Sequence, residues 1–355
     1  MEKVILGESS VSSNSSSFTS ATTITETGHT FIPKRYVLPP SQRPDGTLDL
    51  CPYTFLPIVD LSLLRPQIIE QVLLACKDLG FFKVVNHGIP QSVMKDALDV
   101  ASEFFDLPNE EKMNLYSTNV YTPVRYGTSM NQSKDKACFW RDFLKHYSNP
   151  ISSFIDLWPS NPTSYKKKMG DYAREVQKLH EQLMEVVLES LGLDPNYLHE
   201  EIAQGSQVMA INSYPTCPEP DLTLGLPPHT DFGLLTIILQ NHLGLQIMDK
   251  NEKWHSVPVV EGALMVQLGD QLEVLSNGIY KRIVHRAIVN SEKQRISIAS
   301  IHSLALEKKI GPAPELVDEK NMLSYREGSF NDFLDHISGE DITQKNYIDK
   351  LKINQ

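Results

Sequence analysis

Two histidines and one aspartate stand where they could hold a single metal ion. His229 and Asp231 are two positions apart, and His285 follows much later in the chain. Residues two apart on an extended strand point to the same face, so His229 and Asp231 would reach one ion together. Two imidazoles and one carboxylate bind one face of non-haem Fe(II) and leave positions open for a co-substrate and O₂. We therefore predict an Fe(II) site made by these three residues.

A second pair, Arg295 and Ser297, follows His285 and is also two positions apart. A guanidinium fork matches a carboxylate through two parallel hydrogen bonds, and a hydroxyl adds a third. Beside the iron, this pair would hold the distal carboxylate of 2-oxoglutarate (2OG), whose keto-acid end would chelate the metal. Asn212 and Tyr214 precede the metal-binding strand, and we expect both to face the same co-substrate.

Bulk composition narrows the kind of partner. The chain has 355 residues, 41% hydrophobic and 22% charged, as in ordinary soluble globular proteins. Its longest apolar run is too short to cross a bilayer. With 33 basic and 44 acidic residues, the net charge of −11 opposes a general affinity for nucleic acid or anionic membranes. A small-molecule substrate together with O₂ is the simpler expectation, and a monomer is the default state.

Cysteine usage bears on the compartment. Cys51, Cys76, Cys138 and Cys217 are scattered without CxxC spacing. This pattern argues against a zinc ribbon or a disulfide framework and fits a reducing compartment. We therefore expect a cytoplasmic protein whose thiols have no functional role. The cytoplasm would also keep the iron reduced.

The chain divides by composition into four regions, without a boundary between independent domains. The Ser/Thr-rich stretch 1–30 resembles neither a signal nor a transit peptide, and we expect a disordered tail. A Pro-rich N-terminal arm and a helical region are expected over 31–200. The catalytic core is expected over 201–310, and a C-terminal extension with one helix over 311–355.

Hydrophobic periodicity predicts helices first and strands later. Apolar residues recur every three or four positions in two of the expected helices, 68–79 and 164–191. A third helix is expected to begin at Ser92 as N-cap and to run to about Phe105. Short strands are expected at 56–61 and 81–85, on either side of the first helix.

From residue 208 onward the pattern changes to short strands separated by turn residues. The expected strands are Val208–Tyr214, Leu234–Leu239, Leu245–Asp249, Trp254–Pro258, Ala263–Leu268, Val274–Leu275, Ile283–Val289 and Arg295–Ser300. Eight such strands are typical of a double-stranded β-helix, the jelly roll of cupins. The expected fold is therefore mainly β, with a jelly-roll core buttressed by the N-terminal helices and by a short helix at Ser329–Ile337.

Longer motifs make the chain resemble the plant 2OG/Fe(II)-dependent dioxygenases. The matching stretches, within about Phe31 to His336, are Gly80–Gly88, Asn212–Pro218, Leu226–Asp231, Gly269–Gly278 and Tyr280–Arg286. The segment Trp140–Leu144 adds similarity to the flavanone 3-hydroxylase-like and salicylate hydroxylase-like branches. Position by position, the resemblance implies His229, Asp231 and His285 as iron ligands. It implies Arg295, Ser297 and Tyr214 as 2OG contacts with Asn212 as a helper, and ascorbate as a reductant.

The resemblance implies hydroxylation or desaturation of a small plant specialised metabolite, aromatic in kind, such as a flavonoid or another phenolic. Our expected substrate walls are Phe143, Phe139, Val124, Tyr126, Phe232, Ile301 and His302. Ala210, Ile301 and Ser303 differ from anthocyanidin-synthase-like relatives, which carry Lys, Phe and Glu there. Two alternatives stay open at this point: an Fe(II) oxidase of the same fold that uses no 2OG, and a non-catalytic cupin that binds a small molecule.

Overall fold

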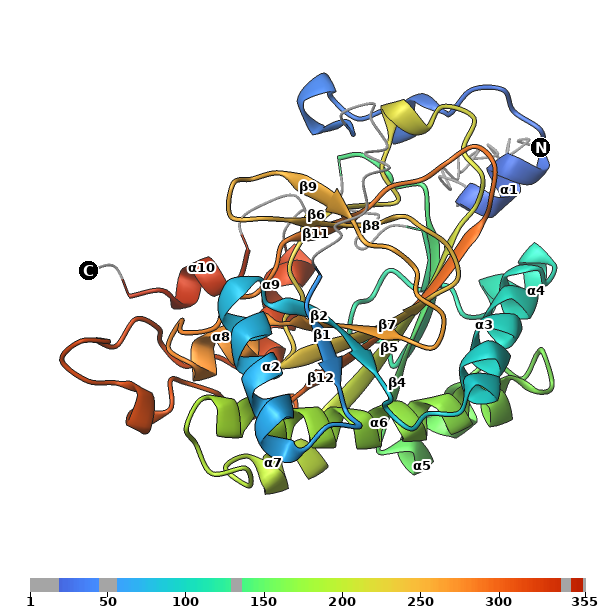
Figure 1. Ribbon diagram of the computed structural model, residues 1–355. Helices are drawn as coiled ribbons and strands as arrows, with labels where there is room; N and C mark the ends of the chain where they lie inside the picture. The colour runs from blue at the N-terminus through green and yellow to red at the C-terminus, as the bar shows by residue number, and fades with distance from the viewer. Residues whose placement is uncertain (1–18, 45–55, 129–135, 340–345, 354–355) are drawn as a thin grey trace, which may run out of the picture.

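Two β-sheets and the helices that cover one of them make up the structure (Figure 1). A computed structural model describes residues 19–44, 56–128, 136–339 and 346–353. Its strands are β1 Ile58–Asp60, β2 Phe81–Val85, β3 Val124–Gly127, β4 Asp142–Asn149, β5 Ser206–Tyr214, β6 Leu226–His229, β7 Leu235–Gln240, β8 Leu245–Met248, β9 Trp254–Ser256, β10 Leu264–Leu268, β11 His285–Ala287 and β12 Arg295–Ser303.

The α-helices are α1 Ala21–Glu26, α2 Arg65–Asp78, α3 Gln91–Phe105, α4 Asn109–Met113, α5 Ile151–Phe154, α6 Tyr165–Ser190, α7 His199–Ala203, α8 Asp270–Leu275, α9 Phe330–Gly339 and α10 Ile348–Leu351. Short 3-10 turns occur at Lys34–Tyr36, Pro40–Gln42, Ile155–Leu157, Pro220–Leu222 and Pro314–Leu316.

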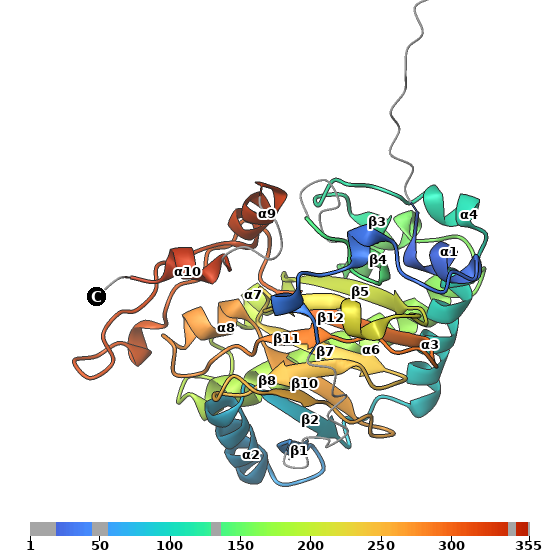
Figure 2. The ribbon, with the colours of Figure 1, turned by 90° about the horizontal axis from the view of Figure 1, so that it is seen from above.

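The larger sheet has eight strands in the order β1-β2-β10-β7-β12-β5-β4-β3, and the smaller has four in the order β6-β11-β8-β9. The two sheets face each other, and the long helix α6 runs beneath the larger one, with α2 and α3 beside it (Figures 1 and 2). This is the double-stranded β-helix with flanking helices that the sequence predicts, so the fold class is confirmed.

Alternate residues of strand β12 point to opposite faces of the larger sheet, one toward the helices and one toward the smaller sheet. It pairs with β5 on one side and β7 on the other, with Ser297 opposite Asn212 and Gln240. Ile296 and Ile298 are buried in one apolar cluster with Val176 and Leu183 of α6. The residues between them therefore point the other way, into the space between the two sheets.

The turn before β2 requires a glycine directly after the expected helix 68–79. Gly80 has a φ of +67°, and a Cβ there would lie 2.1 Å from the Lys281 carbonyl oxygen. The helix α2 and the strand β2 on either side lie close to the predicted ranges.

Two elements differ from the prediction. Val274 and Leu275 belong to helix α8 rather than to a strand. Two apolar residues between turn signals match a strand, but Leu272 and Leu275 are also spaced for a helix, and both are buried. Ser92 lies inside helix α3, which begins at Gln91 after Pro90 and has no side-chain cap. Pro90 itself is the N-cap residue, with an extended backbone, so Ser92 as N-cap is wrong.

The expected disordered tail is wrong for its last residues. Helix α1 spans Ala21–Glu26, and Ser20 caps it by accepting a hydrogen bond from the Thr23 amide. The amides of Ala21 and Thr22 each donate to the Asp142 carboxylate at 2.9 Å. A carboxylate at a helix N-terminus accepts amides that the helix cannot satisfy, so α1 is fastened to β4. Residues 1–18 lie outside the described residues.

Other expectations from composition can be compared with the structure. In the described part of the chain, no helix combines the length and apolar character needed to span a membrane. Cys76, Cys138 and Cys217 are buried free thiols, and Cys51 lies outside the described residues.

Replacing Asp142 with Asn should loosen α1. Asparagine keeps the shape but offers one acceptor oxygen without charge, and hydrogen bonds to a charged group contribute about 1.5–3 kcal/mol. We expect amide hydrogens in residues 21–26 to exchange roughly tenfold faster or more, measured by hydrogen–deuterium exchange with mass spectrometry. Asp156→Asn, at an exposed carboxylate, is the control. Unchanged exchange in α1 would contradict the assigned role of Asp142.

Candidate active site

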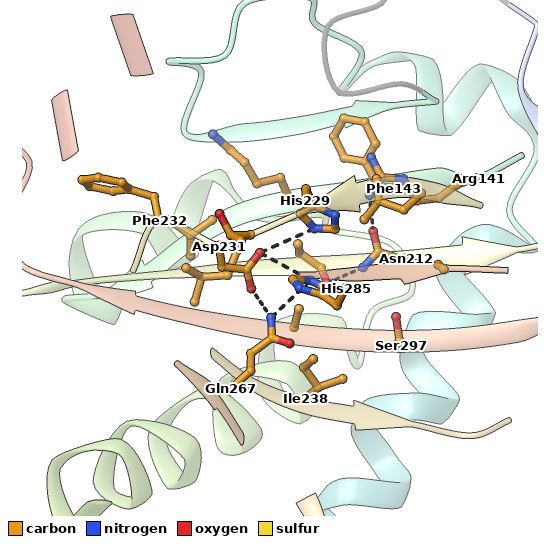
Figure 3. A pocket seen from close by; sticks show the side chains of 18 of the residues that line it. Arg141, Phe143, Asn212, His229, Asp231, Phe232, Ile238, Gln267, His285 and Ser297 are labelled. Carbon is orange, nitrogen blue, oxygen red and sulfur yellow. Dashed lines mark hydrogen bonds and ion pairs between the residues drawn. The ribbon is translucent and has the colours of Figure 1, made fainter. Parts of the chain in front are cut away.

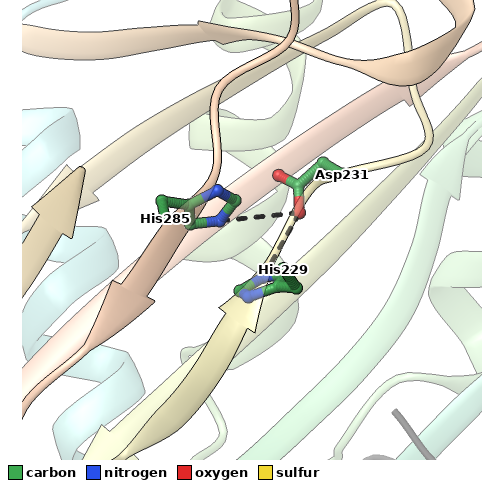
Figure 4. A group of neighbouring side chains, drawn as sticks. All are labelled: His229, Asp231 and His285. Atoms are coloured by element: carbon green, nitrogen blue, oxygen red, sulfur yellow. Dashed lines mark ion pairs between the residues drawn. The ribbon is translucent and has the colours of Figure 1, made fainter. Parts of the chain in front are cut away.

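The structure brings His229, Asp231 and His285 together (Figure 4). One Asp231 carboxylate oxygen, Oδ1, lies 3.6 Å from His229 Nε2 and 3.7 Å from His285 Nε2. Their potential ligand atoms all lie within 4.8 Å of one another. The two histidines are directly opposite each other on β6 and β11, which explains how residues so distant in sequence meet.

Asp231 reaches this point by a route the sequence analysis did not predict. Strand β6 ends at His229, so Asp231 does not share a strand face with it. The chain leaves the strand after His229 and bends at residues 232–234. The Asp231 carbonyl accepts a hydrogen bond from the Asp270 amide at the start of α8. His229 and Asp231 are close together as expected. The expected reason, a shared strand face, is wrong.

Backbone carbonyls set the tautomer of both imidazoles. His229 Nδ1 lies 2.8 Å from the Pro227 carbonyl oxygen, and His285 Nδ1 lies 3.4 Å from that of Ile283. A carbonyl can only accept, so Nδ1–H donates and Nε2 carries the lone pair. Burial, with His285 adding to it, lowers the pKa of His229 well below its usual range. His229 is therefore neutral at ordinary pH, as a metal ligand must be.

Thr236 and Gln267 hold the Asp231 carboxylate in place. The Thr236 hydroxyl and the Gln267 amide donate to Asp231 Oδ2 at 2.6 Å and 2.5 Å. Burial acts to raise the pKa of Asp231, but the two imidazoles and these two donors outweigh it and lower the pKa. Oδ1 is thus left on the side of the histidines as an ionised oxygen.

Gln267 was missed from the sequence, although it touches two members of the triad. Its Nε2 also lies 3.2 Å from His285 Nε2, and Figure 3 shows the side chain pointing to both Asp231 and His285. The signal was a glutamine inside the apolar strand β10, where it is 1% exposed. Buried polar side chains are uncommon without a partner, so this position could have been identified.

The donor set fits a divalent iron ion. Two imidazole Nε2 atoms with available lone pairs and one ionised carboxylate oxygen converge on one point, and no thiolate takes part. This combination suits Fe(II) rather than a structural zinc site, which favours cysteine. The three residues could therefore hold the predicted metal.

Arg295 is shaped to receive an anion. Its guanidinium donates to the Gln240 side chain at 2.8 Å and to the His242 carbonyl at 3.2 Å. Its Nη1 is buried without a hydrogen-bond partner in the described residues. Burial lowers the pKa of Arg295, yet an arginine stays protonated in proteins. A buried cation with an unused donor fits a carboxylate such as that of 2OG.

The other residues expected at the 2OG end lie around Arg295. Ser297 and Tyr214 line the same cavity, and the Arg295 guanidinium carbon lies 4.7 Å from the Tyr214 ring centroid. Gly225 must be a glycine here, because a Cβ would lie 2.4 Å from the Tyr214 ring. Asn212 also lines the cavity, but its oxygen accepts from Arg141 at 3.1 Å. Asn212 therefore positions Arg141.

One cavity joins these residues, and the alternation of the larger sheet selects its walls. Strand β12 contributes Arg295, Ser297, Ala299 and Ile301, and β5 contributes Val208, Ala210, Asn212 and Tyr214. All eight are two positions apart along their strands, as one face of a sheet requires. The smaller sheet contributes the two histidines, Leu226, Leu245 and Ala287.

Three of the seven expected substrate walls line this cavity, namely Phe143, Phe232 and Ile301. Val124 and Tyr126 do not, because their neighbour Arg125 occupies the cavity face of β3 while they pack toward the helices. His302 lies on the helix face of β12, where its ring stacks on His180 at 4.1 Å. Phe139 packs with Leu38 and Leu224 instead. Ser303 likewise lies off the cavity and bonds Ser206.

Helix α9, in the C-terminal extension, is part of the site. We expected residues 329–337 to buttress a sheet, whereas Phe330, Phe333, Leu334 and Ile337 of α9 line the cavity. The Phe333 ring stacks on Phe232 with centroids 4.7 Å apart and planes within 6°. Because Phe232 directly follows Asp231, α9 closes the cavity next to the metal site.

Comparisons with known proteins agree with this geometry. Residues 205–303 match the model of the 2OG-Fe(II) oxygenase superfamily, and residues 56–161 match the non-haem dioxygenase in morphine synthesis N-terminal model. A rice (Oryza sativa subsp. japonica) protein named 2-oxoglutarate-dependent dioxygenase 21, chloroplastic, is 44% identical over 90% of this chain and 94% of its own length.

Two further relatives extend the comparison. Rice flavanone 3-dioxygenase 3 is 42% identical over 89% of this chain and 98% of its own. A crystal structure of JOX2 in complex with 2OG, Fe and JA has a TM-score of 0.85 and 30% identity, and it covers 95% of this chain and 98% of JOX2. With the triad, the arginine and the fold in agreement, the chain belongs to the 2OG/Fe(II)-dependent dioxygenases of plants.

Proposed function

We propose that His229, Asp231 and His285 hold the iron of this 2OG-dependent dioxygenase, and that Arg295 and Ser297 hold the distal carboxylate of 2OG. One observation carries the proposal. Two Nε2 atoms with available lone pairs and one ionised Asp231 oxygen lie close enough together to bind a single ion. The Arg295 guanidinium lies over the Tyr214 ring, which supports it. Asn212 positions the Arg141 side chain by accepting a hydrogen bond from its guanidinium.

Iron and 2OG supply the oxidation: with O₂, 2OG is converted to succinate and CO₂, and one C–H bond of the substrate is oxidised. The protein has three tasks beside this chemistry. Thr236 and Gln267 keep Asp231 ionised and oriented. Phe143, Phe232 and Phe333 cover the cavity with rings that exclude water. The alternating faces of β5 and β12 set where the substrate can lie.

The substrate proposed is a small aromatic metabolite, a flavonoid or another phenolic, that is hydroxylated or desaturated. Four phenylalanines line the cavity, Phe143, Phe232, Phe330 and Phe333. Aromatic rings prefer offset-stacked or edge-to-face contacts with other rings, which a phenolic ring can make. The flavanone 3-dioxygenases among the relatives support this substrate class. Ascorbate as reductant, a monomeric state and a cytoplasmic location stay predictions.

The direct test is an assay of the purified protein with Fe(II), ascorbate, 2OG and a panel of flavonoids and phenolic acids. We expect a mass gain of one oxygen, or a loss of two hydrogens, in at least one compound, together with succinate. The same reaction without 2OG should give no product. Product formation without 2OG would contradict the proposed co-substrate, and metal-independent turnover would contradict the iron site.

Replacing Gln267 with Leu should weaken metal binding without removing a ligand. The variant loses the donor that holds Asp231 Oδ2 and faces His285, and loss of such supporting contacts costs about 10–100-fold in metal affinity. The measurement is a titration of metal-free protein with Fe(II) in the absence of O₂, with Asp231→Ala for comparison.

Gln207→Leu is the matched control for this experiment. Gln207 is also a buried glutamine on a strand of the larger sheet, but it bonds Ala173 and Ser300 on the helix side. Its variant should bind Fe(II) as tightly as the unmodified protein. If Gln267→Leu binds Fe(II) as tightly as Gln207→Leu and the unmodified protein, Gln267 has no positioning role.

Replacing Arg295 with Lys should affect 2OG and spare the metal. A point charge cannot reproduce the guanidinium fork, and hydrogen bonds to charged groups contribute about 1.5–3 kcal/mol, so 2OG binding should weaken roughly tenfold or more. The concentration of 2OG at half-maximal succinate formation reports this change, and Fe(II) affinity without 2OG serves as control. If the dependence on 2OG stays the same, the assignment of Arg295 is wrong.

A further inference from the structure

The start of helix α8 packs against the loop that carries Asp231. The Asp270 amide donates to the Asp231 carbonyl at 2.8 Å. The two main chains approach so closely that a Cβ at Gly269 would lie 2.1 Å from the Gly233 carbonyl oxygen. Because contacts between main chains leave little freedom, the position of α8 sets the main-chain position of Asp231.

A buried arginine joins α8 to the segment that leads into β11. Arg282 Nη1 donates to Glu273 Oε2 at 3.0 Å, and Arg282 Nε forms an ion pair with Asp270 Oδ1 at 3.1 Å. The Arg282 side chain is 13% exposed, and each carboxylate side chain 3%. Asp270 and Glu273 are three positions apart on the helix and therefore neighbours on its surface. One cation thus bridges two buried carboxyl groups of α8.

The Glu273 carboxylate also fixes the main chain just before His285. Its Oε2 accepts from the Arg282 amide at 3.0 Å in addition to the guanidinium. The next residue, Ile283, supplies the carbonyl that accepts from His285 Nδ1. The Tyr325 hydroxyl donates to the other Glu273 oxygen at 2.6 Å and holds the carboxylate in place. Glu273 and Arg282 thereby set the position of the carbonyl that orients His285.

The charge of Arg282 opposes the effect of burial on both acids. Burial acts to raise the pKa of Asp270 and of Glu273, and Arg282 acts to lower each. The pKa of Asp270 stays above its usual range. The pKa of Glu273 is lowered, because Arg282 and the Tyr325 hydroxyl outweigh burial there. Glu273 is therefore ionised, and removal of Arg282 alone would leave a buried charge without its partner.

We propose that Arg282 is a positioning residue of the iron site, acting through its bridge between Asp270 and Glu273. The bridge holds the main chain of Asp231 in place relative to the carbonyl that orients His285. This inference rests on the proposed function, because it takes Asp231 and His285 as iron ligands. The pairing of β6 with β11 relates the two histidines, but Asp231 follows the end of β6 and lies outside it. The bridge through α8 supplies the main-chain link that this pairing lacks.

The main test is a titration of metal-free protein with Fe(II) in the absence of O₂. Arg282→Met keeps an unbranched side chain and removes its charge. We expect its Fe(II) affinity to fall about 10–100-fold, as when other contacts that orient metal ligands are lost. Arg282→Lys keeps the charge, but an ammonium cannot bridge two carboxyl groups as the guanidinium fork does. Its affinity should therefore lie between those of Arg282→Met and the unmodified protein.

A second readout separates positioning from stability. Co(II) bound in place of Fe(II) has a visible absorption spectrum that depends on the geometry of its ligands. Displacement of Asp231 relative to His285 in Arg282→Met should change this spectrum, which a loss of stability alone does not do. All titrations and spectra are recorded well below the melting temperature of each variant.

Arg65→Met is the matched control. Arg65 also bridges two carboxylates, those of Glu185 at 3.4 Å and Glu189 at 2.7 Å, and it joins α2 to α6. None of these three residues lines the cavity. The Arg65→Met variant should bind Fe(II) as tightly as the unmodified protein and give the same Co(II) spectrum, even where its melting temperature falls.

A variant without the charges covers the case in which Arg282→Met does not fold. Arg282→Met combined with Asp270→Asn and Glu273→Gln leaves no buried charge unpaired, and replacing all members of a buried ion pair is tolerated better than removing one. This triple variant has also lost the bridge. Its Fe(II) affinity and Co(II) spectrum should therefore change in the same direction as those of Arg282→Met.

Asp231→Ala separates this inference from the proposed function. If Asp231→Ala binds Fe(II) as tightly as the unmodified protein, the proposed iron site itself is overturned. If Asp231→Ala loses affinity, the role of Arg282 is decided by Arg282→Met, or by the triple variant in its place. A folded variant that keeps either the Fe(II) affinity or the Co(II) spectrum of Arg65→Met overturns the positioning role alone.

Discussion

The pairing of β6 with β11, which sets His229 directly opposite His285, is the constraint on which the site depends. Opposed residues of an antiparallel pair lie close whatever their distance in sequence, and the two imidazole centroids are 4.1 Å apart. Backbone carbonyls two residues earlier in the chain, those of Pro227 and Ile283, accept from Nδ1 of each ring and leave Nε2 free to bind a metal. Two of the three proposed ligands are therefore brought together by strand pairing and oriented by main-chain carbonyls.

The third ligand ties the two sheets together. Asp231 follows the end of β6 in the smaller sheet, yet its carboxylate is held by Thr236 of β7 and Gln267 of β10 in the larger one. The larger sheet in turn presents Arg295 and Ser297 on one face of β12 and packs Ile296 and Ile298 on the other. A slip of one residue in the pairing of β12 would exchange these two sets. The metal end and the anion end of the cavity thus depend on the register of one sheet.

The sequence predicted what depends on residue type and spacing, and it failed where tertiary pairing decides. The pairs His229/Asp231 and Arg295/Ser297 were identified because residue types that bind metals and anions stand two positions apart in the sequence. His285 was identified because it lies between these two pairs. Strands β3 and β4 were missed because Arg125, Lys145 and Asp142 interrupt any apolar alternation. In the fold, Arg125 lies over the Phe143 ring, Lys145 donates to the Val120 carbonyl, and Asp142 accepts from the Ala21 amide. The same omission explains why Val124 and Tyr126 were wrongly expected to line the cavity. Without knowing the strand, its cavity face could not be distinguished from its helix face. Phe139 and His302 were chosen for ring character, which burial against a helix or loop satisfies equally well.

The C-terminal extension shows why the active site cannot be divided at the end of the jelly roll. Phe232 follows the ligand Asp231, and its ring stacks on Phe333 and Phe330 of α9 and meets Tyr347, just before α10, edge-on at 5.5 Å. Aromatic pairs of this kind add about 0.5–1.5 kcal/mol beyond the area they bury. The contacts of one residue beside the metal thereby couple the position of α9 to the loop that carries Asp231. Since Tyr121, from the segment before β3, also donates to Asp335 of α9, both ends of the cavity wall are joined through this helix. The walls around the proposed iron site are thus built from segments at opposite ends of the chain.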